Sequence, residues 1–138
     1  MACESPSHVQ LMMTFKELAW IAGAGAVGTL SRFAIAALVQ NFSGSKFPWG
    51  TLTVNVVGCF LFGLVFILAE EKSLIPAQVK VIVLTGFMGA FTTFSTFGFE
   101  TTALIHSGDW GSAILNIVGQ NVAGIVAVTM GIFLARQF

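Results

Sequence analysis

The chain has 138 residues, of which 56% are hydrophobic and 9% are charged, and its mean hydropathy is +0.90. Because soluble domains carry roughly 25% charged residues, this composition excludes a soluble globular domain and indicates an integral membrane protein. Basic and acidic residues balance at six each, without a basic patch that interleaves aromatic residues, so nucleic acid is not an expected partner. An enzyme is the least expected class, because no nucleophile, base and orienting group are spaced for catalysis.

The length suits a bundle of about four membrane-spanning helices, because each crossing needs about 20 apolar residues. Residues 1–17 are expected to form an N-terminal tail, and residues 18–138 a four-helix transmembrane domain. The first span is predicted at about 18–40, and its segment AGAGAVGTLSR contains the small residues that allow helices to pack closely. Arg32 interrupts this span. An intramembrane arginine suggests a functional site, although its side chain could equally extend to the nearer interface.

The second span is predicted to start near Trp49, after a short polar turn. It carries Thr51, Asn55, Gly58 and Phe62 at a spacing that places them on one helical face. A carboxamide in hydrocarbon needs a partner helix or a polar path, so Asn55 is the most informative member of this stripe. A purely structural hydrogen bond between helices is the alternative.

The third span, from Ala77 to His106, is too long for a straight crossing unless it is tilted or interrupted. Its centre, Gly86 to Glu100, reads GFMGAFTTFSTFGFE and combines hydroxyl residues, glycines and phenylalanines. Broken backbone is tolerated at membrane depth only against protein or a polar cavity. We therefore expect an interruption near residues 86–93 that binds or passes a polar species. Alternatively, the hydroxyls bond back to the preceding turn and the glycines only permit close packing.

A fourth span is predicted at about 112–134. Its residues Ser112, Asn116 and Gln120 recur every four positions and form a second polar stripe. This stripe predicts either a hydrated face or hydrogen bonds between helices.

These segments resemble the bacterial fluoride channels called Fluc or CrcB, over nearly the whole chain from about Ala19. The resemblance rests on GAGAVGTLSR, PWGTLTVNVVG and GFMGAFTTFSTFGFE, which occur in family order and spacing, and the TTFSTF core is highly specific. It implies an all-α protein of the bacterial cytoplasmic (inner) membrane, with four transmembrane helices of which the third is broken. It also implies an antiparallel, dual-topology homodimer surrounded by lipid, with a structural sodium ion at its centre and two pores that export fluoride passively and protect the cell from fluoride toxicity.

The resemblance also assigns roles to individual residues. Phe94 and Phe97 correspond to the pore phenylalanines, and Asn55 to the pore asparagine. The backbone carbonyls of Gly89 and Thr92 correspond to those that hold sodium. An aromatic ring has an electropositive edge that can partly replace water around a small anion, whereas free carbonyl oxygens suit a small hard cation.

Further positions match less directly. Glu100 and Arg32 correspond to the acid of the third span and the arginine of the first, and are expected at a vestibule. Ala90 departs from the family, in which glycine is frequent at this position. The other expected pore residues are polar side chains, of which the last two are assigned from their helical stripe: Thr51, Thr93, Ser95, Thr96, Asn116 and Gln120.

Two other functions remain open at this stage. The alternative is a proton-coupled exporter of small cations, similar to the small multidrug transporters. Such an exporter needs a carboxylate at membrane depth near the start of the first span. That span has none after Glu17, and the buried acid is Glu100. A non-conducting membrane subunit, whose polar stripes serve only assembly, is the third class.

Overall fold

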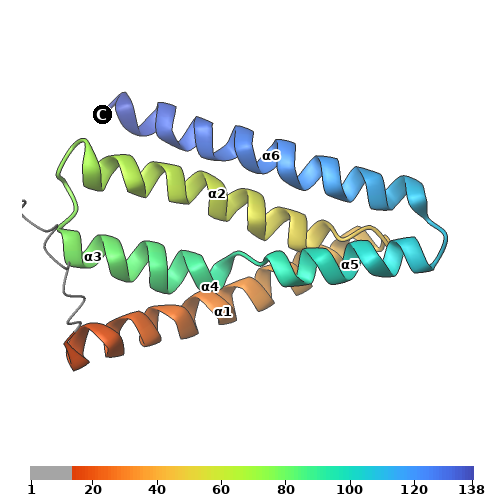
Figure 1. Ribbon diagram of the computed structural model, residues 1–138, viewed down its shortest axis with the longest axis horizontal. Helices are drawn as coiled ribbons and strands as arrows, with labels where there is room; N and C mark the ends of the chain where they lie inside the picture. The colour runs from red at the N-terminus through yellow and green to blue at the C-terminus, as the bar shows by residue number, and fades with distance from the viewer. Residues whose placement is uncertain (1–13) are drawn as a thin grey trace, which may run out of the picture.

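The structure, a computed structural model, describes residues 14–138 and is helical through most of that range. Four stretches are long and apolar enough to cross a membrane: Phe15–Ser43, Trp49–Glu70, Ala77–His106 and Trp110–Arg136. Figure 1 shows them side by side in an elongated bundle, with the start of the first and the end of the last at the same end. The prediction of four spans is confirmed.

The first helix, α1 (Phe15–Ser43), begins before the predicted start at Leu18. The reason is a capping box: the Glu17 backbone N–H donates to Thr14 Oγ1, and the Thr14 backbone N–H donates to Glu17 Oε2 at 2.8 Å. The helix therefore includes residues 15–17, which were expected to belong to the tail. The part of the predicted tail before residue 14 lies outside the described residues.

The central contact of the bundle joins α2 (Trp49–Glu70) to α6 (Trp110–Arg136), which run alongside each other for most of their length (Figure 1). Glycines allow this contact. A Cβ atom at Gly131 would collide with the backbone of Phe60, and one at Gly63 would collide with the backbone of Val128. The two helices therefore touch backbone to backbone, as small residues permit between membrane helices.

The third span consists of α3 (Ala77–Val81), the π-helix η1 (Ile82–Met88), α4 (Gly89–Phe91) and α5 (Phe94–His106). Thr92 (φ −85°, ψ 156°) and Thr93 (φ −148°, ψ 119°) have extended backbone between α4 and α5. The π-helix packs on α1, where a Cβ atom at Gly28 would collide with the Phe87 carbonyl. Glycine in α1 thus lets the third span approach closely just before the extended residues.

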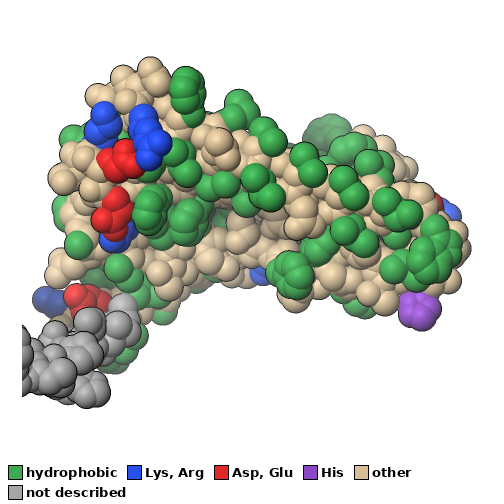
Figure 2. All heavy atoms as spheres, turned by 45° about the horizontal axis from the view of Figure 1, so that its top comes forward, with side chains coloured by type: hydrophobic (Ala, Val, Ile, Leu, Met, Phe, Trp, Pro, Cys, Tyr) green, Lys and Arg blue, Asp and Glu red, His purple; other side chains and the backbone are tan. Residues whose placement is uncertain are grey.

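Apolar side chains are spread along the face of the bundle drawn in Figure 2, and most of the charged side chains visible there gather at its left end. At that end Lys80 pairs with Glu70, and Arg136 Nη2 lies 2.5 Å from Glu71 Oε1. The hydrogen bond from Arg136 holds the pKa of Glu71 below its ordinary value. These pairs connect the ends of α2, α3 and α6 outside the apolar zone, where water can solvate them.

The backbone contact of α6 with α2 gives a test of this fold. We expect Gly131→Ala to destabilise the protein by about 1 to 3 kcal/mol, because the added methyl forces the two backbones apart. Gly119→Ala, also in α6, is the matched control, since a Cβ atom there has nothing within 4 Å. It should be neutral or slightly stabilising, because alanine is the better helix former. Thermal unfolding in detergent measures both, and equal unfolding temperatures for the two variants would contradict the packing.

Candidate functional site

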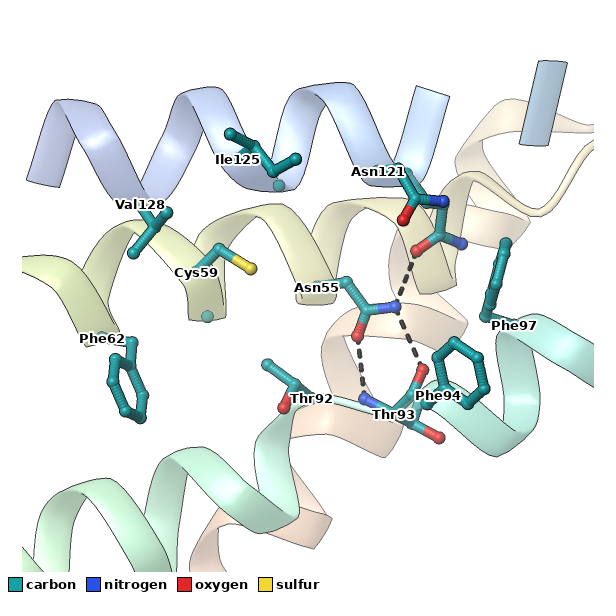
Figure 3. A pocket seen from close by; sticks show the side chains of 13 residues that line it. Asn55, Cys59, Phe62, Thr92, Thr93, Phe94, Phe97, Asn121, Ile125 and Val128 are labelled. Carbon is teal, nitrogen blue, oxygen red and sulfur yellow. Dashed lines mark hydrogen bonds between the residues drawn. The ribbon is translucent and has the colours of Figure 1, made fainter. Parts of the chain in front are cut away.

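The side chain of Asn55, on α2, is paired with the extended backbone of Thr93. The Thr93 N–H donates to Asn55 Oδ1 at 2.8 Å, and Asn55 Nδ2 donates to the Thr93 carbonyl at 3.1 Å (Figure 3). One carboxamide thus satisfies both backbone polar groups of a residue that is not in a helix. Unpaired backbone groups are costly in a membrane interior, so this pairing stabilises the extended residues.

The extended residues also leave two carbonyl groups outside helical hydrogen bonding. In a continuous helix the Thr93 N–H would bond to Gly89 and the Thr96 N–H to Thr92. Here the Thr93 N–H bonds to Asn55 and the Thr96 N–H bonds to Thr93 Oγ1. The carbonyls of Gly89 and Thr92 therefore lose the partners that helix continuity would supply.

A cavity of about 430 Å³, which we call the aromatic cavity, opens beside these residues. The rings of Phe94 and Phe97 lie on one side, with centroids 5.5 Å apart and an interplanar angle of 54° (Figure 3). Phe94 is 83% exposed, so its ring edge is accessible. The cavity is lined by Asn55, Gly58, Cys59, Phe62, Thr92, Thr93, Phe94, Phe97, Gln120, Asn121, Gly124, Ile125 and Val128.

A second cavity, of about 620 Å³, lies between α1, α2 and α5, and we call it the arginine cavity. Thr51 Oγ1 donates to Glu100 Oε1 at 2.8 Å, and Glu100 Oε2 is buried with no hydrogen-bond partner within the described part of the chain. The polar residues that line this cavity are Thr29, Arg32, Gln40, Thr51, Thr93, Thr96 and Glu100. Thr93 lines both cavities, so the two adjoin at the extended segment.

A chain of side-chain amides continues from Asn55 into the bundle. Asn55 Nδ2 donates to Gln120 Oε1 at 2.7 Å, and Gln120 Nε2 donates to Asn116 Oδ1 at 3.2 Å. Asn116 Nδ2 then donates to Thr101 Oγ1 at 2.9 Å, and Thr101 Oγ1 donates to the Phe97 carbonyl at 2.7 Å. Side chains of α2, α6 and α5 thus form one hydrogen-bonded network.

The structure brings together most of the residues expected at a site. Those at the aromatic cavity are Asn55, Thr92, Thr93, Phe94, Phe97 and Gln120, and those at the arginine cavity are Arg32, Thr51, Thr93, Thr96 and Glu100. Three others lie apart. Ser95 is exposed with its Oγ 3.3 Å from Thr93 Oγ1, Gly89 is exposed outside both linings, and Asn116 is fully buried, where it makes hydrogen bonds between helices.

Sequence reasoning missed some residues of this region. Asn121 and Cys59 line the aromatic cavity, and Thr101 ends the amide network. Asn121 directly follows Gln120, so it does not belong to the stripe of residues that recur every four positions. Thr101 looks like an ordinary back-bonding threonine, and only its buried contact with Asn116 distinguishes it. A count of polar residues at membrane depth would have flagged Asn121 and Thr101, without showing which cavity or network they join.

Comparisons with known proteins agree on one family. The family described as CrcB-like protein, Camphor Resistance (CrcB), matches residues 19–132. A fluoride-specific ion channel FluC of Nitrosococcus oceani is 53% identical over 122 residues, which cover 88% of this chain and 98% of that protein. Proteins of the same name from Maridesulfovibrio salexigens and Magnetococcus marinus are 46% and 41% identical, over 85% and 87% of this chain and 93% and 98% of theirs.

These matches extend over all four spans and include the residues of both cavities. With its four apolar helices, the chain is a multi-pass bacterial membrane protein. Because the family model matches residues 19–132 and a relative is 53% identical over 88% of the chain, the chain belongs to the CrcB-like family.

Proposed function

We propose that the chain forms a fluoride-selective channel, through which fluoride leaves the cell passively and so does not reach toxic levels. The observation that carries the proposal is the aromatic cavity, which is lined both by the rings of Phe94 and Phe97 and by the amides of Asn55 and Gln120. The relatives named fluoride-specific ion channels support the same ion.

The chemistry of this cavity suits a small anion. Fluoride must exchange its water for other weakly positive partners, and ring edges and amide N–H groups are such partners. None of the described residues that line the aromatic cavity is charged. An anion there would meet dipoles only, so it can enter without being bound too tightly to leave.

The arginine cavity is proposed as the vestibule of this route. The Arg32 guanidinium would attract anions toward it, and Glu100 lies on the same lining. From there an ion would pass the hydroxyls of Thr93 and Thr96, which are 3.0 Å apart, to reach the aromatic cavity. The interruption of the third span at Thr92 and Thr93 would thus form the junction of the route.

We further propose that two copies assemble as an antiparallel, dual-topology homodimer in the cytoplasmic membrane, around a structural sodium ion. The released carbonyls of Gly89 and Thr92 fit a sodium ligand set, because hard cations prefer oxygen ligands. Gly89 is exposed on the single chain, and two carbonyls are fewer ligands than such an ion takes, so a second copy would complete the site. When bound, sodium would hold the two third spans together.

Replacement of the rings tests the fluoride route. We expect Phe94→Ile and Phe97→Ile to reduce fluoride efflux from proteoliposomes by about tenfold or more, because isoleucine lacks an electropositive edge. Assembly should be retained. Phe99→Ile is the matched control, since Phe99 lies on the same helix, is 75% exposed and is outside the lining of the aromatic cavity. Normal efflux by both pore variants would refute the assignment, and efflux that required a proton gradient would favour the exporter instead.

Labelling tests the dual topology. In a variant with Cys3→Ser and Cys59→Ala, the substitution Leu74→Cys places one thiol in the exposed loop between α2 and α3. A membrane-impermeant thiol reagent added to intact cells should label about half of the copies, and the rest only after the cells are opened. Labelling of all copies from one side would exclude antiparallel assembly.

Ion replacement tests the sodium site. If the Gly89 and Thr92 carbonyls hold sodium as part of the structure, exchange of sodium for N-methylglucamine should weaken the dimer, because a ligand bound only by the assembled form stabilises it. Gel filtration at decreasing protein concentration measures this. Fluoride flux proportional to a sodium gradient would instead indicate coupled transport and would contradict a structural ion.

A further inference from the structure

The network from Asn55 to Thr101 has only one possible direction, because a backbone group ends it on each side. It starts at the Thr93 N–H, which can only donate, and it ends at the Phe97 carbonyl, which can only accept. Between them each amide accepts with its oxygen and donates with its nitrogen. The orientation of all three carboxamides is therefore fixed by the backbone of the segment that carries the phenylalanines.

Because of this direction, the amide oxygens of the network are used inside it, and the groups left over are N–H donors. The three amide oxygens, of Asn55, Gln120 and Asn116, are all occupied by donors within the network. Asn55 uses both amide hydrogens, whereas Gln120 and Asn116 use one each in it. The hydrogens left over belong to Gln120, which lines the aromatic cavity, and to Asn116, which is fully buried.

We propose that Thr101, Asn116 and Gln120 form, with Asn55, a directional relay that keeps the amide oxygens of Asn55 and Gln120 away from the aromatic cavity and leaves an N–H of Gln120 there for an anion. Thr101 and Asn116 are positioning residues in this relay, and neither lines the cavity. The inference rests on the proposed fluoride channel and assigns it a selectivity device. Without the relay, an amide could rotate and turn a carbonyl oxygen toward the ion, which repels an anion.

The hydroxyl of Thr101 gives the sharpest test, because valine has the same shape and removes only the end of the relay. Thr101→Val should reduce fluoride efflux by about tenfold, since it leaves a buried amide hydrogen without an acceptor and frees the chain to reorient. Thr101→Ser keeps the hydroxyl and should restore efflux. Thr102→Val is the matched control, because the Thr102 hydroxyl is exposed and bonds only back to the Gly98 carbonyl.

A second measurement does not depend on conduction. Hydrogen exchange followed by mass spectrometry reports the Thr93 N–H, which the relay holds through Asn55. We expect its exchange to be about tenfold faster in Thr101→Val and unchanged in Thr102→Val. Equal efflux and equal Thr93 exchange in Thr101→Val and the parent would overturn the relay. If the parent moved no fluoride, the proposed function would fail while this measurement still tested the relay.

A double variant separates positioning from simple stability. Thr101→Val together with Asn116→Leu replaces both partners of that hydrogen bond by apolar groups of similar shape, which removes the unpaired Asn116 amide but leaves Gln120 Nε2 without its acceptor. We expect assembly to recover relative to Thr101→Val, while fluoride efflux stays low because Gln120 is no longer oriented. Full recovery of efflux in the double variant would overturn the positioning role.

Discussion

The pairing of the Asn55 side-chain amide with the backbone N–H and C=O of Thr93 is the constraint on which the rest of the site depends. Extended backbone in the middle of an apolar bundle is unstable unless its N–H and C=O find partners. Asn55 supplies both partners from the neighbouring helix at 2.8 and 3.1 Å. Everything else at the centre, including the released carbonyls, the exposed Phe94 ring and the meeting of two cavities at Thr93, follows from that interruption.

Close backbone contacts between neighbouring helices hold the elements that carry this pairing. The α2 helix, which carries Asn55, is pressed against α6 by backbone contacts at Gly63 and Gly131, and α6 carries Gln120. The third span is held from the other side by α1, through contacts that glycines permit. Close backbone contacts leave little freedom for the helices to slide, so the amides and the rings keep their relative positions.

Much of the fold could be predicted from the sequence, because membrane spans are encoded by length and hydropathy and the loops by charge and proline. The stripe of Thr51, Asn55, Gly58 and Phe62 also predicted side chains that line the cavities. The start of α1 could not be placed, since it depends on a hydrogen-bonded cap at Thr14 rather than on hydrophobicity. Whether the stripe of Ser112, Asn116 and Gln120 faced water or protein also depended on tertiary contacts. The structure buries Asn116 and Gln120, and Gln120 still lines the aromatic cavity.

The π-helix η1 changes which direction the later residues of the third span face. A π-helix closes its hydrogen bonds over i to i+5 and so holds more residues in each turn than an α-helix. Ile82–Met88 therefore rotates every later position of the third span relative to an ideal α-helical count from Ala77. A single helical wheel drawn through the whole span therefore does not give the faces of the residues after η1. Designed insertions or deletions in η1 would change which residues of the third span face the aromatic cavity, even though η1 ends before the extended threonines.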